Sequence, residues 1–83
     1  MHKSPRIAIQ GGVYSTSAPA TSTATITLPI NINSTGFKLP IIAVDNAADN
    51  MLGVSSISNS TLVIKKGVND NSARTGRWGL ISL

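Results

Sequence analysis

Residues 24–32, ATITLPINI, decide the fold class of this chain because they place an apolar side chain at every second position. The side chains of a β-strand alternate between its two faces, so this pattern predicts a strand with one face in a core and the other in water. Pro29 has no backbone N–H to donate to a neighbouring strand. We therefore expect the strand to lie at a sheet edge or to have a free side at Pro29.

Five further segments are rich in β-branched and aromatic residues and are separated by breaks of Gly, Asn, Ser and Thr, a composition typical of strands joined by turns. They comprise residues 6–14, 37–44, 51–57, 61–66 and 77–83. No window carries apolar residues at helical spacing. Six short strands in 83 residues predict an all-β fold, a small six-stranded antiparallel β-sandwich. Residues 6–83 are its expected single domain, and residues 1–5 a disordered or linker N-terminus.

Two of the predicted strands are apolar on both faces. In residues 37–44 and 77–83, apolar side chains occupy odd-numbered and even-numbered positions alike. A sandwich of this size has one small core, and this chain has no cysteine to support it with a disulfide. The second apolar face therefore needs a partner, and the expected partner is a copy of the same chain. The predicted interface between copies is formed by Ile42, Val44, Trp78, Ile81 and Leu83.

Backbone irregularity is the alternative explanation of the two-faced strands. A β-bulge in either strand would return its apolar side chains to one face and remove the need for a partner. Gly11 and Gly12 interrupt the first predicted strand. This glycine pair predicts a bulge or a close approach of two backbones at that point.

The direction of the strands assigns the loops to two ends of the molecule. If consecutive strands run antiparallel in up-and-down order, the connections over residues 15–23, 46–50 and 67–76 share the end far from the N-terminus. These are the longer connections, whereas residues 33–36 and 58–60 form short turns at the other end. A module with one plain end and one elaborated end is suited to presenting loops.

Four motifs span nearly the whole chain after Arg6. They are Ile9-Gln10-Gly11-Gly12-Val13, Ile26-Thr27-Leu28-Pro29-Ile30 followed by Phe37, Ser60-Thr61-Leu62-Val63-Ile64, and Arg77-Trp78-Gly79-Leu80-Ile81-Ser82-Leu83. Together they resemble the C-terminal tip domains of bacteriophage tail fibres, whose trimeric sandwich is similar to H-type lectins. The chain departs from that family at Gly11, where members carry an aromatic residue, and at its Ser-Leu ending, where members carry glycine and an aromatic residue.

The resemblance implies a homotrimer at the distal end of a tail fibre on a virion. The N-terminal end would attach to the fibre shaft, and the exposed loops would bind a polysaccharide or an outer-membrane protein of the bacterial surface. The net charge of +4 suits an anionic glycan, because opposite charge steers association. Two alternatives remain: a structural or decoration protein of a viral particle, and a small nucleic-acid-binding β-barrel.

The far-end loops hold the candidate receptor-binding residues. Asp and Asn side chains offer the acceptors and donors that sugar hydroxyls need, and an arginine forms a fork onto a carboxylate or phosphate. The predicted set is Tyr14, Asp45, Asn46, Asp49, Asn50, Asn69, Asp70, Asn71 and Arg74. Each has a plainer interpretation, because Asx residues also form turns and exposed arginines also keep a surface soluble.

Neither a metal nor a cofactor is predicted. The Asx-rich loops offer the oxygen ligands that calcium accepts, but neither loop has the spacing of a known calcium-binding loop. Catalysis lacks its usual groups, since the one histidine is His2 and the three carboxylates are Asp45, Asp49 and Asp70. Asp45 and Asp49 flank one short loop, where turn formation explains them more simply than a catalytic pair does. The sequence therefore predicts a binding protein and not an enzyme.

Nucleic acid and membrane are not expected as partners. The Lys and Arg residues are scattered, with one adjacent basic pair, Lys65 and Lys66, and the aromatic residues number three. Proteins that bind nucleic acid usually cluster such charges beside aromatic side chains on which bases stack. No stretch approaches the ~20 consecutive apolar residues of a membrane span, so membrane insertion is not predicted.

Overall fold

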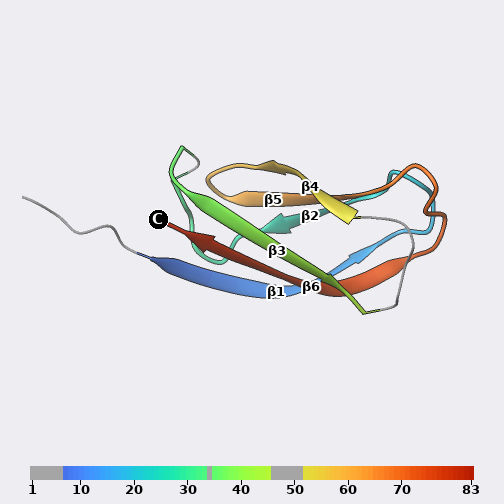
Figure 1. Ribbon diagram of the computed structural model, residues 1–83, viewed down its shortest axis with the longest axis horizontal. Coiled ribbons are helices and arrows are strands. Elements are labelled where there is room, and N and C mark those ends of the chain that lie inside the picture. Colours follow the sequence, from blue (N-terminus) through green and yellow to red (C-terminus); the bar gives the residue numbers. More distant parts are fainter. Residues whose placement is uncertain (1–6, 34, 46–51) are drawn as a thin grey trace, which may run out of the picture.

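The computed structural model describes residues 7–33, 35–45 and 52–83 and confirms an all-β fold of six antiparallel strands in two three-stranded sheets (Figure 1). The strands are β1 (Ala8–Thr16), β2 (Thr23–Thr27), β3 (Lys38–Val44), β4 (Leu52–Ile57), β5 (Thr61–Lys66) and β6 (Arg74–Ser82). Over these described ranges there is no helix long and apolar enough to cross a membrane.

Each sheet is named below after its central strand. The β6 sheet has the order β1-β6-β3, and the β5 sheet has the order β2-β5-β4. Consecutive strands alternate between the two sheets except for β4 and β5, which are joined by the short turn at residues 58–60. Every pairing is antiparallel, as the sequence predicted, although this order of strands within the sheets is not that of a simple meander.

The loops at the far end are arranged as the alternation of strand direction predicted. The β1–β2 and β5–β6 connections lie together at the end opposite the start of β1 (Figure 1), and the backbone N–H of Thr21 donates to the carbonyl of Gly67 at 3.3 Å. The third predicted far-end loop, residues 46–50, lies outside the described residues. The structure thus brings two of the three predicted loops into contact.

The core lies between the sheets and is supplied mainly by the two central strands. Leu62 and Ile64 of β5 face Trp78 and Leu80 of β6, and all four side chains are 5% exposed or less. Burial of a large apolar side chain stabilises a fold by about 1.5–3 kcal/mol. The alternation of apolar residues in both central strands is what directs these side chains to one common interior.

The stretch that decided the fold class is a shorter strand than expected. β2 ends at Thr27. Beyond it the even-numbered apolar residues no longer belong to a strand, but Leu28 and Ile32 are still buried in the core, and Ile30 is half-exposed. The Gln10 side chain of the opposite sheet donates to the Ile30 carbonyl at 2.9 Å and accepts from the Ile30 N–H at 3.0 Å. Pro29 lies just past the end of β2, which is an edge strand as predicted. The prediction of a short near-end turn at residues 33–36 was wrong, because the connection from β2 to β3 spans residues 28–37 and is longer than the β1–β2 and β5–β6 connections.

The strands of the β6 sheet contain no bulge. Their register runs without a shift from β1 through β6 to β3, so the alternative explanation of the two-faced strands was wrong. The glycine pair instead marks close approach, because a Cβ on Gly11 would lie 2.7 Å from the Trp78 carbonyl oxygen and one on Gly12 would lie 3.0 Å from Trp78 Nε1. The bulge among the described strands is in β4, between Val54 and Ser56.

The five residues predicted to join copies of the chain divide between the two sides of the β6 sheet. Trp78 is a core residue, Ile42 packs against that core, and Val44 is half-buried on the side of Ile42. These three side chains face inward and cannot form an outer contact surface, which corrects the prediction for them. Ile81 and Leu83 alternate with the buried Leu80 and lie on the outer side.

Candidate functional site

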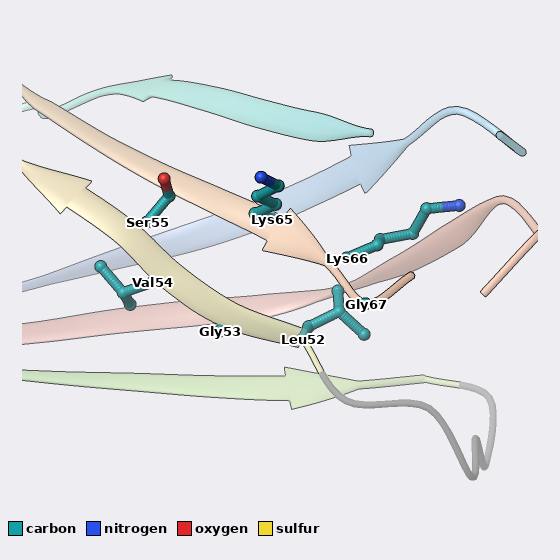
Figure 2. A pocket seen from close by; sticks show the side chains of 7 residues that line it. All are labelled: Leu52, Gly53, Val54, Ser55, Lys65, Lys66 and Gly67. Carbon is teal, nitrogen blue, oxygen red and sulfur yellow. The ribbon is translucent and has the colours of Figure 1, made fainter. Parts of the chain in front are cut away.

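Lys66 ties the two described far-end loops together from inside. Its side chain extends from the end of β5 toward these loops (Figure 2) and is 2% exposed. Nζ donates to the carbonyl oxygens of Ser17 at 2.6 Å, Ala18 at 2.8 Å and Ser72 at 2.7 Å. A lysine ammonium has three protons to donate, and a buried charge needs such partners to offset its loss of water. The β1–β2 and β5–β6 loops are therefore held to one buried cation.

The sequence analysis noted Lys66 only as one of an adjacent basic pair and missed this internal role. The signal was present in the strand pattern, because Lys66 stands two and four residues after Ile64 and Leu62 and so shares their inward face. Lys65, at the intervening position, is exposed.

Asp70 and Arg74 form a second anchor within the β5–β6 loop. Asp70 is fully buried, and Arg74 Nε donates to its two carboxylate oxygens at 3.1 and 3.0 Å. The backbone N–H of Ser72 also donates to Asp70 Oδ1 at 3.2 Å. The bond from Arg74 is the largest cause that lowers the pKa of Asp70, and the same bond raises the pKa of Arg74.

These contacts correct the prediction that Asp70 and Arg74 bind a receptor directly. The Asp70 carboxylate is inside the loop, and the side chain of Arg74 is 13% exposed. Arg74 is further fixed by its backbone N–H, which donates to Thr16 Oγ1 at 3.2 Å. Both residues shape the loop and do not present charge to a ligand.

Tyr14 is also directed inward, against the prediction that its ring is available to a receptor. The side chain is 5% exposed, and its hydroxyl donates to the Ala43 carbonyl at 3.1 Å. Burial, with a smaller contribution from the charge of Asp45, raises the pKa of Tyr14. The ring fits closely because Gly76 has no side chain, and a Cβ there would lie 2.8 Å from the tyrosine hydroxyl.

A strained backbone conformation in the β1–β2 loop also indicates that this loop is held in one shape. Thr21 has φ of 61°, in the left-handed region that β-branched residues rarely adopt. Such a backbone costs on the order of 1–3 kcal/mol and persists only where the surroundings hold it. The hydrogen bond from Thr21 to the neighbouring loop, described above, is one of the contacts that hold it.

The exposed surface of the far end consists of small polar and apolar side chains. Of the predicted receptor-binding residues, Asn69 and Asn71 are exposed on the β5–β6 loop and Asp45 is exposed at the end of β3. Val68 is 75% exposed beside Asn69. Three other predicted residues, Asn46, Asp49 and Asn50, lie outside the described residues.

A hollow of about 390 Å³ lies just below these loops, on the outer side of the β6 sheet. Asp45 Oδ2 accepts a hydrogen bond from Thr75 Oγ1 at 3.2 Å, and Arg77 NH1 lies 3.6 Å from Asp45 Oδ1. Val13 and Ser15 of β1 complete the lining together with the backbone of neighbouring residues. Two charges, two hydroxyls and an aliphatic wall form a surface on which a polar ligand can be oriented.

Thr75, Arg77 and Ser15 were not among the predicted binding residues. Their outward direction follows from strand alternation, but their meeting with Asp45 depends on β6 lying between β1 and β3. No signal in the sequence gives that order.

A second hollow, of about 280 Å³, opens on the β5 sheet near the same end (Figure 2). It arises because Gly53 of β4 pairs with Lys65 and has no side chain, and a Cβ added there would meet nothing within 4 Å. Ser55 and Lys65 project to one side of the sheet, and Val54 projects to the other (Figure 2). The hollow therefore presents one ammonium and one hydroxyl to solvent.

Across the part of the chain that the structure describes, no group of three or more His, Cys, Asp or Glu side chains is placed to hold a metal ion. Comparisons with protein-family models, with curated proteins and with solved structures found no significant match to this chain.

Proposed function

We propose that this chain is the receptor-binding tip of a bacteriophage tail fibre, a homotrimer that binds a bacterial surface glycan or protein through its far-end loops without catalysing a reaction. The observation that carries the proposal is the internal fixation of these loops. Lys66 and Asp70 are buried, and their contacts with loop carbonyls and with Arg74 hold two loops in one shape. Loops fixed before binding lose less conformational entropy when a ligand arrives.

The exposed chemistry of the far end suits a polar receptor. Asn69 and Asn71 are exposed on the β5–β6 loop and offer amide donors and acceptors. A single contact of this kind is weak, and threefold repetition would raise the overall affinity through effective concentration. β1 begins and β6 ends at the opposite end of the sandwich (Figure 1), which leaves the far-end loops clear of a shaft joined there.

The proposal is tested by binding of the fluorescently labelled protein to a panel of intact bacteria and to surface polysaccharide extracted from them. The double variant Asn69→Ala/Asn71→Ala should bind at least about tenfold more weakly, since each hydrogen bond removed contributes roughly 0.5–1.5 kcal/mol. Thr25→Ala/Thr27→Ala, on the exposed side of β2, is the matched control and should bind as the wild type does. Equal binding by both variants, or no binding to any cell, would contradict the proposal.

The structural or decoration protein of a viral particle is the second candidate. The observation that favours it is the exposed apolar side chains on the outer side of the β6 sheet, which other coat components could cover. It predicts that far-end loop variants leave particle assembly unchanged. The nucleic-acid-binding alternative has less support, because Lys66 and Arg74, two of the seven Lys and Arg residues, make the internal contacts described above.

A further inference from the structure

The outer side of the β6 sheet is an apolar surface. The register places Ile9, Ile81 and Leu39 in one row across the three strands, and Gly11, Gly79 and Ile41 in the next row. The exposed fractions of Ile9, Leu39 and Ile41 are 71%, 47% and 52%. Other exposed apolar residues of the same strands or directly beside their ends are Ile7, Val13, Phe37 and Leu83. The term outer β6 face is used below for this surface.

The size of the outer β6 face is that of a protein–protein contact. Seven large apolar side chains that are 46% to 76% exposed leave several hundred Å² of apolar surface in water. A soluble monomer rarely carries more than a few hundred Å² in one patch, and each partner of a stable complex buries ~800 Å². The face is therefore large enough to be the buried surface of an assembly.

Gly79, at the centre of this face, makes no close contact with the described residues that would require glycine. A Cβ at Gly79 would approach no atom closer than 3.9 Å, which is ordinary contact. Glycine weakens a strand interior and often marks a site where another backbone approaches closely. With Gly11 beside it on β1, two of the three strands lack a side chain in this row. At its β1 and β6 positions the row is therefore lower than the side chains of Ile9 and Val13 on either side, and Ile41 of β3 stands at its edge.

The charges at the far-end border of the face favour a copy of the chain as its partner. Arg77 and Asp45 stand on this face with side chains 76% and 47% exposed, and their closest atoms are 3.6 Å apart. In a ring of three copies each contact joins two different parts of the face, so the cation of one copy can lie opposite the anion of the next. In the same way, a protruding isoleucine of one copy can pack into the Gly11–Gly79 row of the next copy.

We infer that the outer β6 face is the surface through which copies of this chain assemble, with the Gly11–Gly79 row as the place where two chains approach most closely. The number of copies, three, is taken from the proposed function, and the inference adds the surface through which they meet. In a threefold assembly, one part of this face on each chain contacts a different part of it on the next chain.

The test is the solution mass of the 83-residue chain, measured by light scattering through a dilution series. The wild type should have the mass of three chains. Ile9→Lys places an unpaired charge in the contact and should weaken association by at least ~100-fold, the equivalent of ~3 kcal/mol. Thr25→Lys is the matched control, because it puts the same charge on an exposed position of β2 in the other sheet.

A second pair of variants distinguishes weaker association from unfolding of the separated chain. Gly79→Ala adds one methyl group that the single chain accommodates, and Gly53→Ala adds the same group where it would meet nothing. Only Gly79→Ala should weaken association, by about tenfold, while circular dichroism shows folded protein for both.

The outcomes separate this inference from the proposed function. Association unaffected by Ile9→Lys and by Gly79→Ala would overturn the assignment of the surface and leave receptor binding untouched. A wild-type chain that is monomeric throughout the series would overturn the inference as well. Association that responds as expected, in a protein that binds no bacterial cell, would support the surface and contradict the proposed function.

Discussion

The two sheets of this protein are built alike on the inside and differently on the outside. Each sheet contributes two large apolar side chains from its central strand to the core. The outward positions of the β5 sheet are threonine, serine and lysine, apart from Val63 and Gly53, whereas those of the β6 sheet are mostly isoleucine, leucine, valine and glycine. Threonine and isoleucine are both β-branched and suit a strand equally well. The difference between the sheets therefore concerns what each outer side contacts and not how the strands form.

The prediction with the largest expected effect tests whether the two sheets contribute equally to the core. Leu62→Ala in β5 and Leu80→Ala in β6 each remove a fully buried side chain. Each should lower the free energy of unfolding by about 2–5 kcal/mol, because less apolar surface is buried on folding and the missing atoms leave a cavity. Urea unfolding followed by circular dichroism measures both. A destabilisation confined to one of the two variants would mean that the core is not shared equally.

Two adjacent lysines of β5 test how differently the inner and outer sides of one sheet affect stability. Lys66→Met leaves three backbone carbonyls without their donor and should destabilise the fold by about 2–4 kcal/mol. Lys65→Met changes an exposed side chain and should alter stability by no more than about 0.5 kcal/mol. Thermal unfolding of the two variants gives the comparison, and similar melting temperatures would argue against the buried role of Lys66.

The outward residues of the β6 sheet can be replaced by the residue type that the β5 sheet carries on its outer side. Ile9→Thr/Ile41→Thr gives the outer β6 face the chemistry of the β5 sheet and should weaken association roughly tenfold per substitution, since less apolar surface is then buried between copies. The unfolding free energy of the dissociated chain should change little, because both side chains are more than half exposed there. Sedimentation velocity over a range of concentrations measures the association. Unchanged sedimentation would show that these side chains are not in the contact.

The smallest effect concerns the far end, where the two sheets share their loops. The Arg74 contact lowers the pKa of Asp70, so its stabilising contribution is complete above the unfolded-state pKa of about 4 and is lost as the pH falls through the lower folded-state pKa. Melting temperature should therefore fall in acid for the wild type, and less steeply for Asp70→Asn. Asp45→Asn, at an exposed carboxylate, is the control and should follow the wild type.

Much of the fold follows from local pattern. The alternation in residues 24–32 and in β5 predicted strands and an interior, and strand direction placed the loops, because both depend on neighbours in the chain. The order β1-β6-β3 did not follow, since it pairs residues that are more than 30 positions apart along the sequence. The contact surface was consequently assigned in part to Trp78 and Ile42, which the structure places on the core side.

The candidate site was predicted less well than the fold. Composition correctly indicated that the far-end loops are polar, but it could not tell a polar group that faces water from one that faces another polar group. Asp70 and Arg74 satisfy each other inside their loop, so neither is the exposed recognition group that its residue type suggested. Alternation alone would have identified Lys66, because a lysine in phase with Leu62 and Ile64 must point inward.

The burial of Lys66 beside the exposed Lys65 gives the molecule a natural chemical reporter. An amine-directed reagent reaches Lys65 at all times, but it can reach Lys66 only when the bonds to Ser17, Ala18 and Ser72 are broken. The ratio of labelling at two consecutive positions then measures how often the far-end loops separate, with the reagent concentration and pH shared by both sites. A ligand that binds the closed loops should slow labelling at Lys66 alone.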